Sequence, residues 1–199
     1  MKNIFFILIA FFLIGCRDSS DDITAKLPPE TQIGANTFGC LVNGRLFYPR
    51  DGIGDVMSVA NAISYFGSSS NTYDYNEMTV ANFIDGKPMN YLYFHLHDLP
   101  NKGVGEYIWK ESNFNNDIDG LMQNYLYVRA FDYNTNTWKW YTSYENSGKT
   151  IITKNDIQNF IISGTFSGKL RTTNGKEEIE ISNGRFDLNI KTLPLKKFP

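Results

Sequence analysis

Asn-Gly pairs constrain the fold of this chain more than any other feature of its sequence. Asn43-Gly44 and Asn174-Gly175 each lie between two short segments rich in apolar residues. Both residue types tolerate positive φ, so such a pair predicts a tight β-hairpin. A two-residue loop at Asn43-Gly44 places Cys40 opposite Phe47, where Cys40 is most simply a small residue of a packed core. The chain is therefore expected to fold from antiparallel strands.

The hairpin around Asn174-Gly175 is supported by its side chains as well as by its turn. Counting outward from the loop gives the pairs Arg171 with Glu178, Leu170 with Ile179, and Lys169 with Glu180. Opposite charges then face each other and apolar meets apolar, which stabilises an antiparallel pair. The apolar residues predicted for the inner face are Ile162, Phe166, Leu170, Ile179 and Ile181. Asn183-Gly184 predicts a bulge or turn before the alternation resumes at Phe186, Leu188 and Ile190.

A third hairpin, in residues 125–141, is heavily aromatic. If residues 134–137 form a four-residue loop, the opposing pairs are Tyr133 with Trp138, Asp132 with Lys139, and Phe131 with Trp140. One face then carries Tyr125, Tyr127, Phe131, Tyr133, Trp138 and Trp140, and the other carries Leu126, Val128, Ala130 and Tyr141. The second set is an ordinary core stripe. The aromatic set is either covered by other strands or exposed as a surface that stacks on sugar rings or on partner proteins.

Five further segments have the pattern of strands: 56–66, 77–84, 90–98, 105–110 and 148–153. Residues 156–160 are compatible with one short helical turn. About ten short strands separated by turn signals are typical of an antiparallel β-sandwich or barrel. The sequence therefore predicts a single all-β domain over residues 37–192, followed by a C-terminal tail over residues 193–199.

Both histidines of the chain, His95 and His97, lie on one predicted strand and share the face opposite its apolar residues. Two imidazoles at this spacing can bind one metal ion, with Asp98 or Glu106 as a third ligand nearby in sequence. The simpler interpretation is a pair of half-exposed strand residues. A Ser-His-Asp hydrolase would need the same histidines as its base, and no Gly-x-Ser-x-Gly motif accompanies them. No residue is assigned a catalytic role, and no cofactor is expected.

The N-terminus has the pattern of a signal peptide. Lys2 precedes an unbroken apolar run from Ile4 to Ile14, which is too short to span a bilayer as a helix. The run ends in Leu13-Ile14-Gly15-Cys16, which resembles the bacterial lipobox, where cleavage precedes a cysteine that carries diacylglycerol and an N-acyl chain. Residues 1–15 are therefore expected to be removed and Cys16 to become a lipid anchor, because several acyl chains hold a protein stably on a bilayer. The alternative is a plain secretory signal that happens to contain a cysteine.

Residues 16–36 are polar and carry acidic residues near their start, which predicts a flexible tether between membrane and domain. Acidic residues shortly after the cysteine, Asp18, Asp21 and Asp22, also resemble the surface-export signal of Bacteroidetes lipoproteins, which implies a place outside the outer membrane. The alternative is any solvated linker. The formal net charge of −2 provides no basic field for a phosphate backbone, so nucleic acid is not an expected partner.

Three segments resemble small, functionally uncharacterised outer-membrane lipoproteins of Bacteroidetes. They are Thr37 to Gly44 after a tether containing Leu-Pro-Pro, Ile162 to Gly168, and Ile181 to Asp187. The resemblance implies a lipidated β domain in the cell envelope and supplies no catalytic residues. The expected function is that of a non-enzymatic binding or accessory module that contacts a glycan, a lipid or an envelope protein through its aromatic face. The alternatives are a metal-assisted hydrolase centred on His95 and His97, and a purely structural envelope component.

Overall fold

The computed structural model describes residues 26–52, 60–69, 74–84, 87–115, 119–132 and 135–199. The expected signal peptide, Cys16 and the first part of the predicted tether lie outside these residues, as does Tyr133 of the aromatic set. The strands are β1 (Thr37–Val42), β2 (Arg45–Phe47), β3 (Ile63–Ser69), β4 (Asp74–Ile84), β5 (Lys87–His97), β6 (Gly105–Ile108), β7 (Tyr125–Asp132), β8 (Thr137–Thr142), β9 (Gly148–Asp156), β10 (Ile161–Thr172) and β11 (Glu178–Asn189). Two short helices, α1 (Leu99–Lys102) and the 3-10 helix η2 (Leu193–Leu195), accompany them.

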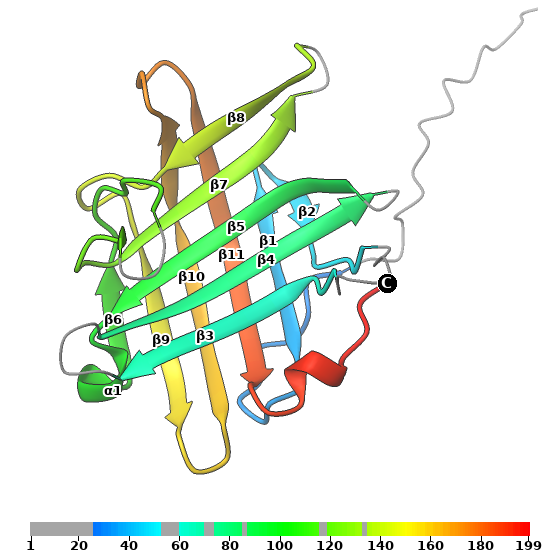
Figure 1. Ribbon diagram of the computed structural model, residues 1–199, viewed down its shortest axis with the longest axis vertical. Helices are drawn as coiled ribbons and strands as arrows, with labels where there is room; N and C mark the ends of the chain where they lie inside the picture. Colours follow the sequence, from blue (N-terminus) through cyan, green and yellow to red (C-terminus); the bar gives the residue numbers. More distant parts are fainter. Residues whose placement is uncertain (1–25, 53–59, 70–73, 85–86, 116–118, 133–134) are drawn as a thin grey trace, which may run out of the picture.

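The strands form one antiparallel sheet that folds over on itself. Their order is β2-β1-β11-β10-β8-β7-β5-β4-β3, with β9 pairing β10 and β6 pairing β9. β10 pairs β9 from Ile161 to Gly168 but pairs β8 only through Arg171 and Thr172, so the sheet divides at this point into two layers. Figure 1 shows the strands of the front layer, β3-β4-β5-β7-β8, crossing those of the back layer steeply. Among the described strands β2, β3 and β6 remain edges, so the sheet is not closed into a barrel and the all-β sandwich interpretation is confirmed.

The two Asn-Gly hairpins have the predicted registers. Cys40 pairs with Phe47 across the first turn, in which Asn43 and Gly44 have φ values of 49° and 76°. The observed pairs of the C-terminal hairpin are Arg171 with Glu178, Leu170 with Ile179, and Lys169 with Glu180. β11 continues through Asn183-Gly184, and its register against both neighbouring strands shifts beside this pair, which confirms a bulge.

The register predicted for the aromatic hairpin is wrong by two residues. The observed pairs are Phe131 with Trp138, Arg129 with Trp140, and Asp132 with Thr137. Trp138 therefore does not face Tyr133, and Lys139 faces Ala130 rather than Asp132. Because strand side chains alternate, a shift of two residues leaves each side chain on its predicted face. For the residues of the set that the structure describes, the assignment of faces is therefore correct although the pairs are not.

The hydrophobic core lies between the two layers. The predicted inner face of the C-terminal hairpin is buried throughout, with exposed fractions of 0–8% for Ile162, Phe166, Leu170, Ile179 and Ile181. It packs against front-layer residues such as Leu92, Phe94 and Leu126, and against Trp109 after β6. Cys40 is a free, fully buried thiol whose pKa burial raises to about 12, as expected for a packed core residue.

Both ends of the described chain pack against the sheet. Asp187 of β11 is 1% exposed and accepts five hydrogen bonds. The donors are the hydroxyls of Thr31 and Ser163 and the backbone amides of Ile33, Gly34 and Ala35. Near the other end Leu193 is buried, and the backbone amide of Phe198 donates to the carboxylate of Asp51 at 2.9 Å. The packed chain therefore extends beyond the predicted limits of residues 37 and 192.

Three local features differ from the sequence pattern. Residues 157–160 form the turn of the β9–β10 hairpin rather than a helical turn, because β9 continues to Asp156 and pairs there with Ile161. The strand expected over residues 56–66 is described from Ile63 onward, and residues 56–59 lie outside the described chain. The helix α1 occupies Leu99–Lys102, a segment for which the sequence pattern predicts no helix. In the described part of the chain no helix has the length and apolar character needed to cross a membrane.

Candidate binding face

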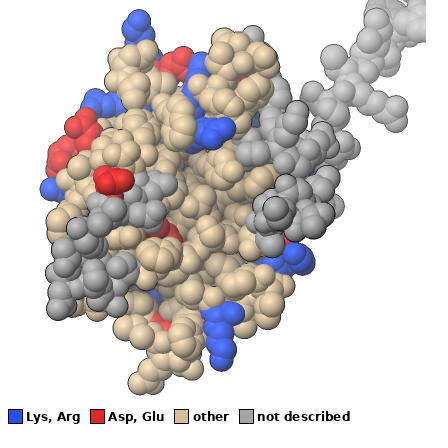
Figure 2. All heavy atoms as spheres, viewed as in Figure 1, with Lys and Arg blue, Asp and Glu red and all other residues tan. Residues whose placement is uncertain are grey.

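Aromatic residues gather on the side of the front layer that faces away from the core. Alternation along each strand directs Leu92, Phe94 and Leu126 inward, so the intervening residues point outward. We define the outer aromatic face as Phe66, Tyr75, Tyr91, Tyr93, His95, Tyr125, Tyr127, Phe131, Trp138 and Trp140. Figure 2 shows that the centre of this face is mostly free of charged side chains.

Part of the outer aromatic face forms a second, smaller core. The rings of Tyr93 and Tyr127 stack at 4.8 Å, and Phe114 from the segment after β6 lies edge-on to Tyr127 at 5.6 Å. The hydroxyl of Tyr125 donates to the backbone oxygen of Asn115 at 2.8 Å. Tyr93, Tyr125 and Tyr127 are only 1–7% exposed as a result. These three tyrosines therefore stabilise the fold and cannot contact a large ligand directly.

The β7–β8 end of the face remains accessible. Trp140 is 40% exposed, and Trp138 and Phe131 are half-buried with their rings 5.2 Å apart. The guanidinium of Arg129 lies 3.7 Å from the ring centre of Trp138 and 5.6 Å from that of Trp140. From the sequence, the aromatic set is expected to be either covered or exposed. In the structure Tyr125 and Tyr127 are covered, whereas Phe131, Trp138 and Trp140 remain partly exposed.

Arg129 holds a positive charge that no described carboxylate pairs with. Its contacts are to the rings of Trp138, Trp140 and Tyr91, and its buried Nε has no hydrogen-bond partner among the described residues. Aromatic faces attract a guanidinium through their quadrupole but leave its N–H donors unsatisfied. This part of the face therefore combines flat aromatic surface with a charged donor group, and we call Arg129, Trp138 and Trp140 the Arg–Trp cluster.

His95 is a buried structural residue rather than the half-exposed one that the sequence suggests. It is 1% exposed, and its Nδ1 lies 2.8 Å from Oε1 of Glu77 on β4. Its ring is stacked between Tyr125 at 4.4 Å and Tyr75 at 5.4 Å. The imidazole and the carboxylate therefore satisfy each other within an aromatic layer.

His97 lies at the end of β5, where its Nδ1 is 2.9 Å from the backbone oxygen of Asp74. Within the described residues, no group of three or more histidine, cysteine, aspartate or glutamate side chains is arranged to hold a metal ion. Glu106, one of the third ligands considered from sequence, instead pairs with Lys149 on the back layer. The described residues thus give His95 and His97 packing and hydrogen-bonding contacts and do not assemble a metal site around them.

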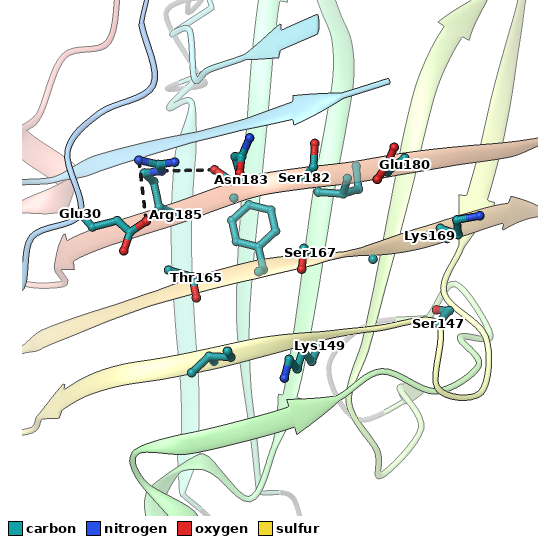
Figure 3. A pocket seen from close by; sticks show the side chains of 15 residues that line it. Glu30, Ser147, Lys149, Thr165, Ser167, Lys169, Glu180, Ser182, Asn183 and Arg185 are labelled. Carbon is teal, nitrogen blue, oxygen red and sulfur yellow. Dashed lines mark hydrogen bonds and ion pairs between the residues drawn. The ribbon is translucent and has the colours of Figure 1, made fainter. Parts of the chain in front are cut away.

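A polar groove of about 700 Å³ crosses the outer side of β9, β10 and β11. Figure 3 shows hydroxyl side chains of Thr165, Ser167 and Ser182 between charged residues of neighbouring strands. The basic residues of this groove are already paired: Lys149 with Glu106 at 2.5 Å, Lys169 with Glu178 at 2.8 Å, and Arg185 with Glu30 at 3.8 Å. A charged ligand would have to displace these carboxylates before it could bind the basic residues of the groove. The Arg–Trp cluster does not impose this cost, because its arginine has no carboxylate partner among the described residues.

A second cavity, of about 670 Å³, opens between the layers beside β2. Its walls include Leu92, Val128 and Tyr141 of the front layer and Ile179 of the back layer. At its mouth Lys139 is held by Asp132 at 3.0 Å and by Glu177 at 2.8 Å. The hydrogen bonds that Lys139 donates to Glu177 and Asp132 raise the pKa of its ammonium group, so Lys139 stays charged and both carboxylates already compensate that charge.

Sequence reasoning missed two parts of the candidate face. Arg129 carries no sequence motif, because it is a single arginine between apolar strand residues; only strand alternation places it on the face opposite Leu126 and Val128. Phe114 lies in a segment without strand periodicity, and only its contacts with Tyr127 and Trp140 reveal its role. Of the predicted aromatic set, the structure brings together Tyr125, Tyr127, Phe131, Trp138 and Trp140 on one face.

Comparison with models of protein families, with curated proteins and with solved structures found no match to this chain. The geometry of the face is therefore the basis for a functional proposal.

Proposed function

We propose that this protein is a lipid-anchored module of the cell envelope that binds an acidic glycan through the Arg–Trp cluster. The anchor is the lipidated Cys16 expected from the lipobox-like sequence, and the likeness to Bacteroidetes lipoproteins favours the outer membrane, with the domain on its outer side. The observation that carries the proposal is the half-exposed pair of tryptophans with an arginine that has no carboxylate partner among the described residues.

Sugar rings and aromatic rings are complementary in shape and polarity. The C–H faces of a pyranose pack on tryptophan, while its hydroxyl groups need donors and acceptors at the edges. Trp140, which is 40% exposed, provides such a surface, and Arg129 beside it offers guanidinium N–H groups. Arginine binds carboxylates in a two-pronged geometry that lysine lacks. An acidic sugar therefore fits the cluster better than a neutral one.

Binding to the lipidated protein in detergent micelles tests this proposal. Retardation in gels that contain polygalacturonate, alginate or dextran reports affinity, and tryptophan fluorescence reports contact with the cluster. We expect the acidic polymers to retard the protein and dextran to retard it less. Trp140→Ala and Arg129→Gln should each weaken acidic-glycan binding by about tenfold, since a stacking or charge-assisted contact contributes roughly 1–2 kcal/mol.

Phe66→Ala is the matched control, because Phe66 is 53% exposed on the same face but lies on β3, at the far edge from β8. This variant should bind as the original protein does. The proposal fails if acidic and neutral polymers bind equally weakly, or if Phe66→Ala lowers affinity as much as Trp140→Ala does. Unfolding curves of all three variants separate loss of binding from loss of fold.

A further inference from the structure

Exposed apolar side chains gather at the end of the molecule where the β9–β10 hairpin projects. Among the large apolar residues that the structure describes, three of the four most exposed lie here: Leu195 at 80%, Ile33 at 74% and Ile157 at 69%. Phe160, at 51%, lies in the same hairpin turn as Ile157. Figure 1 shows this turn, the segment before β1 and the helix η2 together at the lower end of the molecule.

Hydrogen bonds join these three segments into one surface. The backbone amide of Ile190 donates to the oxygen of Phe160 at 2.8 Å, and Lys154 donates to the oxygen of Gln32 at 3.0 Å. The side chain of Asn36 donates to Thr192 at 2.9 Å, next to η2. We define the apolar end as Ile33, Ile157, Phe160 and Leu195.

The hairpin turn presents its aromatic residue in a conformation that costs energy. Phe160 has a φ of 60°, in the left-handed region that non-glycine residues rarely adopt. Asp156 holds the turn by accepting hydrogen bonds from the backbone and side chain of Asn159. Strained backbone that the surrounding structure keeps in place clusters at functional sites such as ligand clamps.

The charges around the apolar end have one predominant sign. Residues 31–36, 154–160 and 189–199 contain four lysines, Lys154, Lys191, Lys196 and Lys197, and one acidic residue, Asp156. Figure 2 shows mostly uncharged surface at the lower end of the molecule, with a blue side chain to its right and a small red area above it. Apolar tips flanked by lysines match the boundary between acyl chains and anionic headgroups of a bilayer.

A cavity of about 580 Å³ adjoins the apolar end. Ile157 and Phe160 form one side of it, and Tyr65, Leu99 and Ile162 lie on others. Its lining is predominantly apolar, so it provides space next to the exposed tips into which part of a lipid tail can enter.

We propose that the apolar end rests on the lipid bilayer and fixes the orientation of the anchored domain. This inference builds on the lipid anchor of the proposed function. Lys26, the first described residue, lies ten positions after Cys16, and ten residue spacings span at most about 36 Å even when extended. The domain is thus held close enough for its apolar tips to enter the bilayer by about 5–10 Å. In this orientation the front layer is roughly perpendicular to the plane of the membrane. The outer aromatic face then points parallel to the membrane surface, into the solvent.

Spin labels on the lipidated protein test this orientation. Gln158→Cys places a label in the β9–β10 turn, and Lys176→Cys places one in the β10–β11 turn at the opposite end; both positions are exposed and Cys40 is buried. The vesicles contain phosphatidylethanolamine and phosphatidylglycerol in a ratio of about three to one. We expect the label at position 158 to be relaxed more by oxygen than by a water-soluble nickel chelate, and the label at position 176 to show the reverse.

Replacing the four apolar-end residues by serine should move the label at position 158 into water and reduce its protection from the chelate at least fivefold. The protein should stay on the vesicles through its anchor and keep its unfolding midpoint, because these side chains are exposed. An aqueous label at position 158 in the original sequence, or a membrane-embedded label at position 176, overturns the inference. Mass spectrometry of the N-terminal peptide shows separately whether Cys16 is lipidated, so a missing anchor is distinguished from a wrong orientation.

Discussion

Asp187 binds the N-terminal segment to the sheet through several hydrogen bonds. Its carboxylate accepts hydrogen bonds from Thr31, Ile33, Gly34, Ala35 and Ser163, at 2.6–3.1 Å. Asp187→Asn keeps the shape but replaces one acceptor oxygen by a donor, which leaves buried amide or hydroxyl groups unsatisfied. We expect this variant to lower the free energy of unfolding by about 2–4 kcal/mol at pH 7, as measured by urea denaturation.

The pH dependence of this effect has a definite sign. Burial alone would raise the pKa of Asp187, but the hydrogen bonds from Thr31, Ser163 and the backbone amides outweigh it and lower the pKa below its ordinary value. The stabilisation is therefore complete above the ordinary aspartate pKa of about 4 and is lost as the pH falls through the lower folded value. The difference between the original protein and Asp187→Asn should shrink below about pH 4; a difference that grows in acid would contradict this account.

The burial of a single side chain can be predicted from sequence only where its neighbours are local in the chain. The burial of Cys40 follows from its place opposite Phe47, which a two-residue turn determines locally. The burial of His95 does not, because its partners Glu77, Tyr75 and Tyr125 come from β4 and β7. Strand alternation gives the face of a side chain, but what covers that face depends on chain segments that are distant in sequence.

At the scale of elements, the packing between β10 and β11 depends on the absence of a side chain at Gly184. A Cβ atom at Gly184 would lie 2.5 Å from the ring of Phe166, the core residue paired with it. Gly184→Ala therefore forces the ring to move within a packed core, and we expect a loss of about 1–3 kcal/mol in the free energy of unfolding. Calorimetry or denaturant titration measures this loss.

The double variant Gly184→Ala, Phe166→Leu shows whether the ring is the cause. Phe166→Leu alone should also destabilise the protein, because it removes a buried ring that is 2% exposed. If the methyl group and the ring collide, the double variant should lose less free energy than the two single variants together. Additive losses would mean that Gly184 acts through its backbone conformation instead.

The accuracy of the predicted registers depended on the turns. Asn43-Gly44 and Asn174-Gly175 set the pairing of their strands, and both registers agree with the sequence. The segment between β7 and β8 contains several polar residues with similar turn preferences, so turn chemistry does not determine where its loop lies. The predicted residue pairs of this hairpin therefore differ from the observed pairs by two residues. The aromatic residues are nevertheless assigned to the correct face, because side chains on a strand return to the same face every two residues.

For the whole molecule, the sequence predicted the strand content but not the layer to which each strand belongs. Hairpin neighbours such as β4 and β5 follow from the chain order, whereas the pairing of β1 with β11 joins residues far apart in sequence. The fold of the sheet at β10 depends on two residue pairs with β8, which no local pattern marks. The Arg–Trp cluster and the apolar end likewise became visible only when distant segments were brought together.

The orientation of the whole molecule predicts how it responds to a longer tether. Twenty glycine and serine residues inserted before Lys26 add a coil with an end-to-end distance of about 25 Å. If the apolar end holds the domain on the bilayer, energy transfer from a dye at position 176 to acceptor lipids should stay the same in the lengthened protein. With the four apolar-end residues replaced by serine, the same insertion should lower the transfer, because only the tether then limits the distance. A decrease caused by the insertion alone would show that the tether, rather than the apolar end, determines the position of the domain.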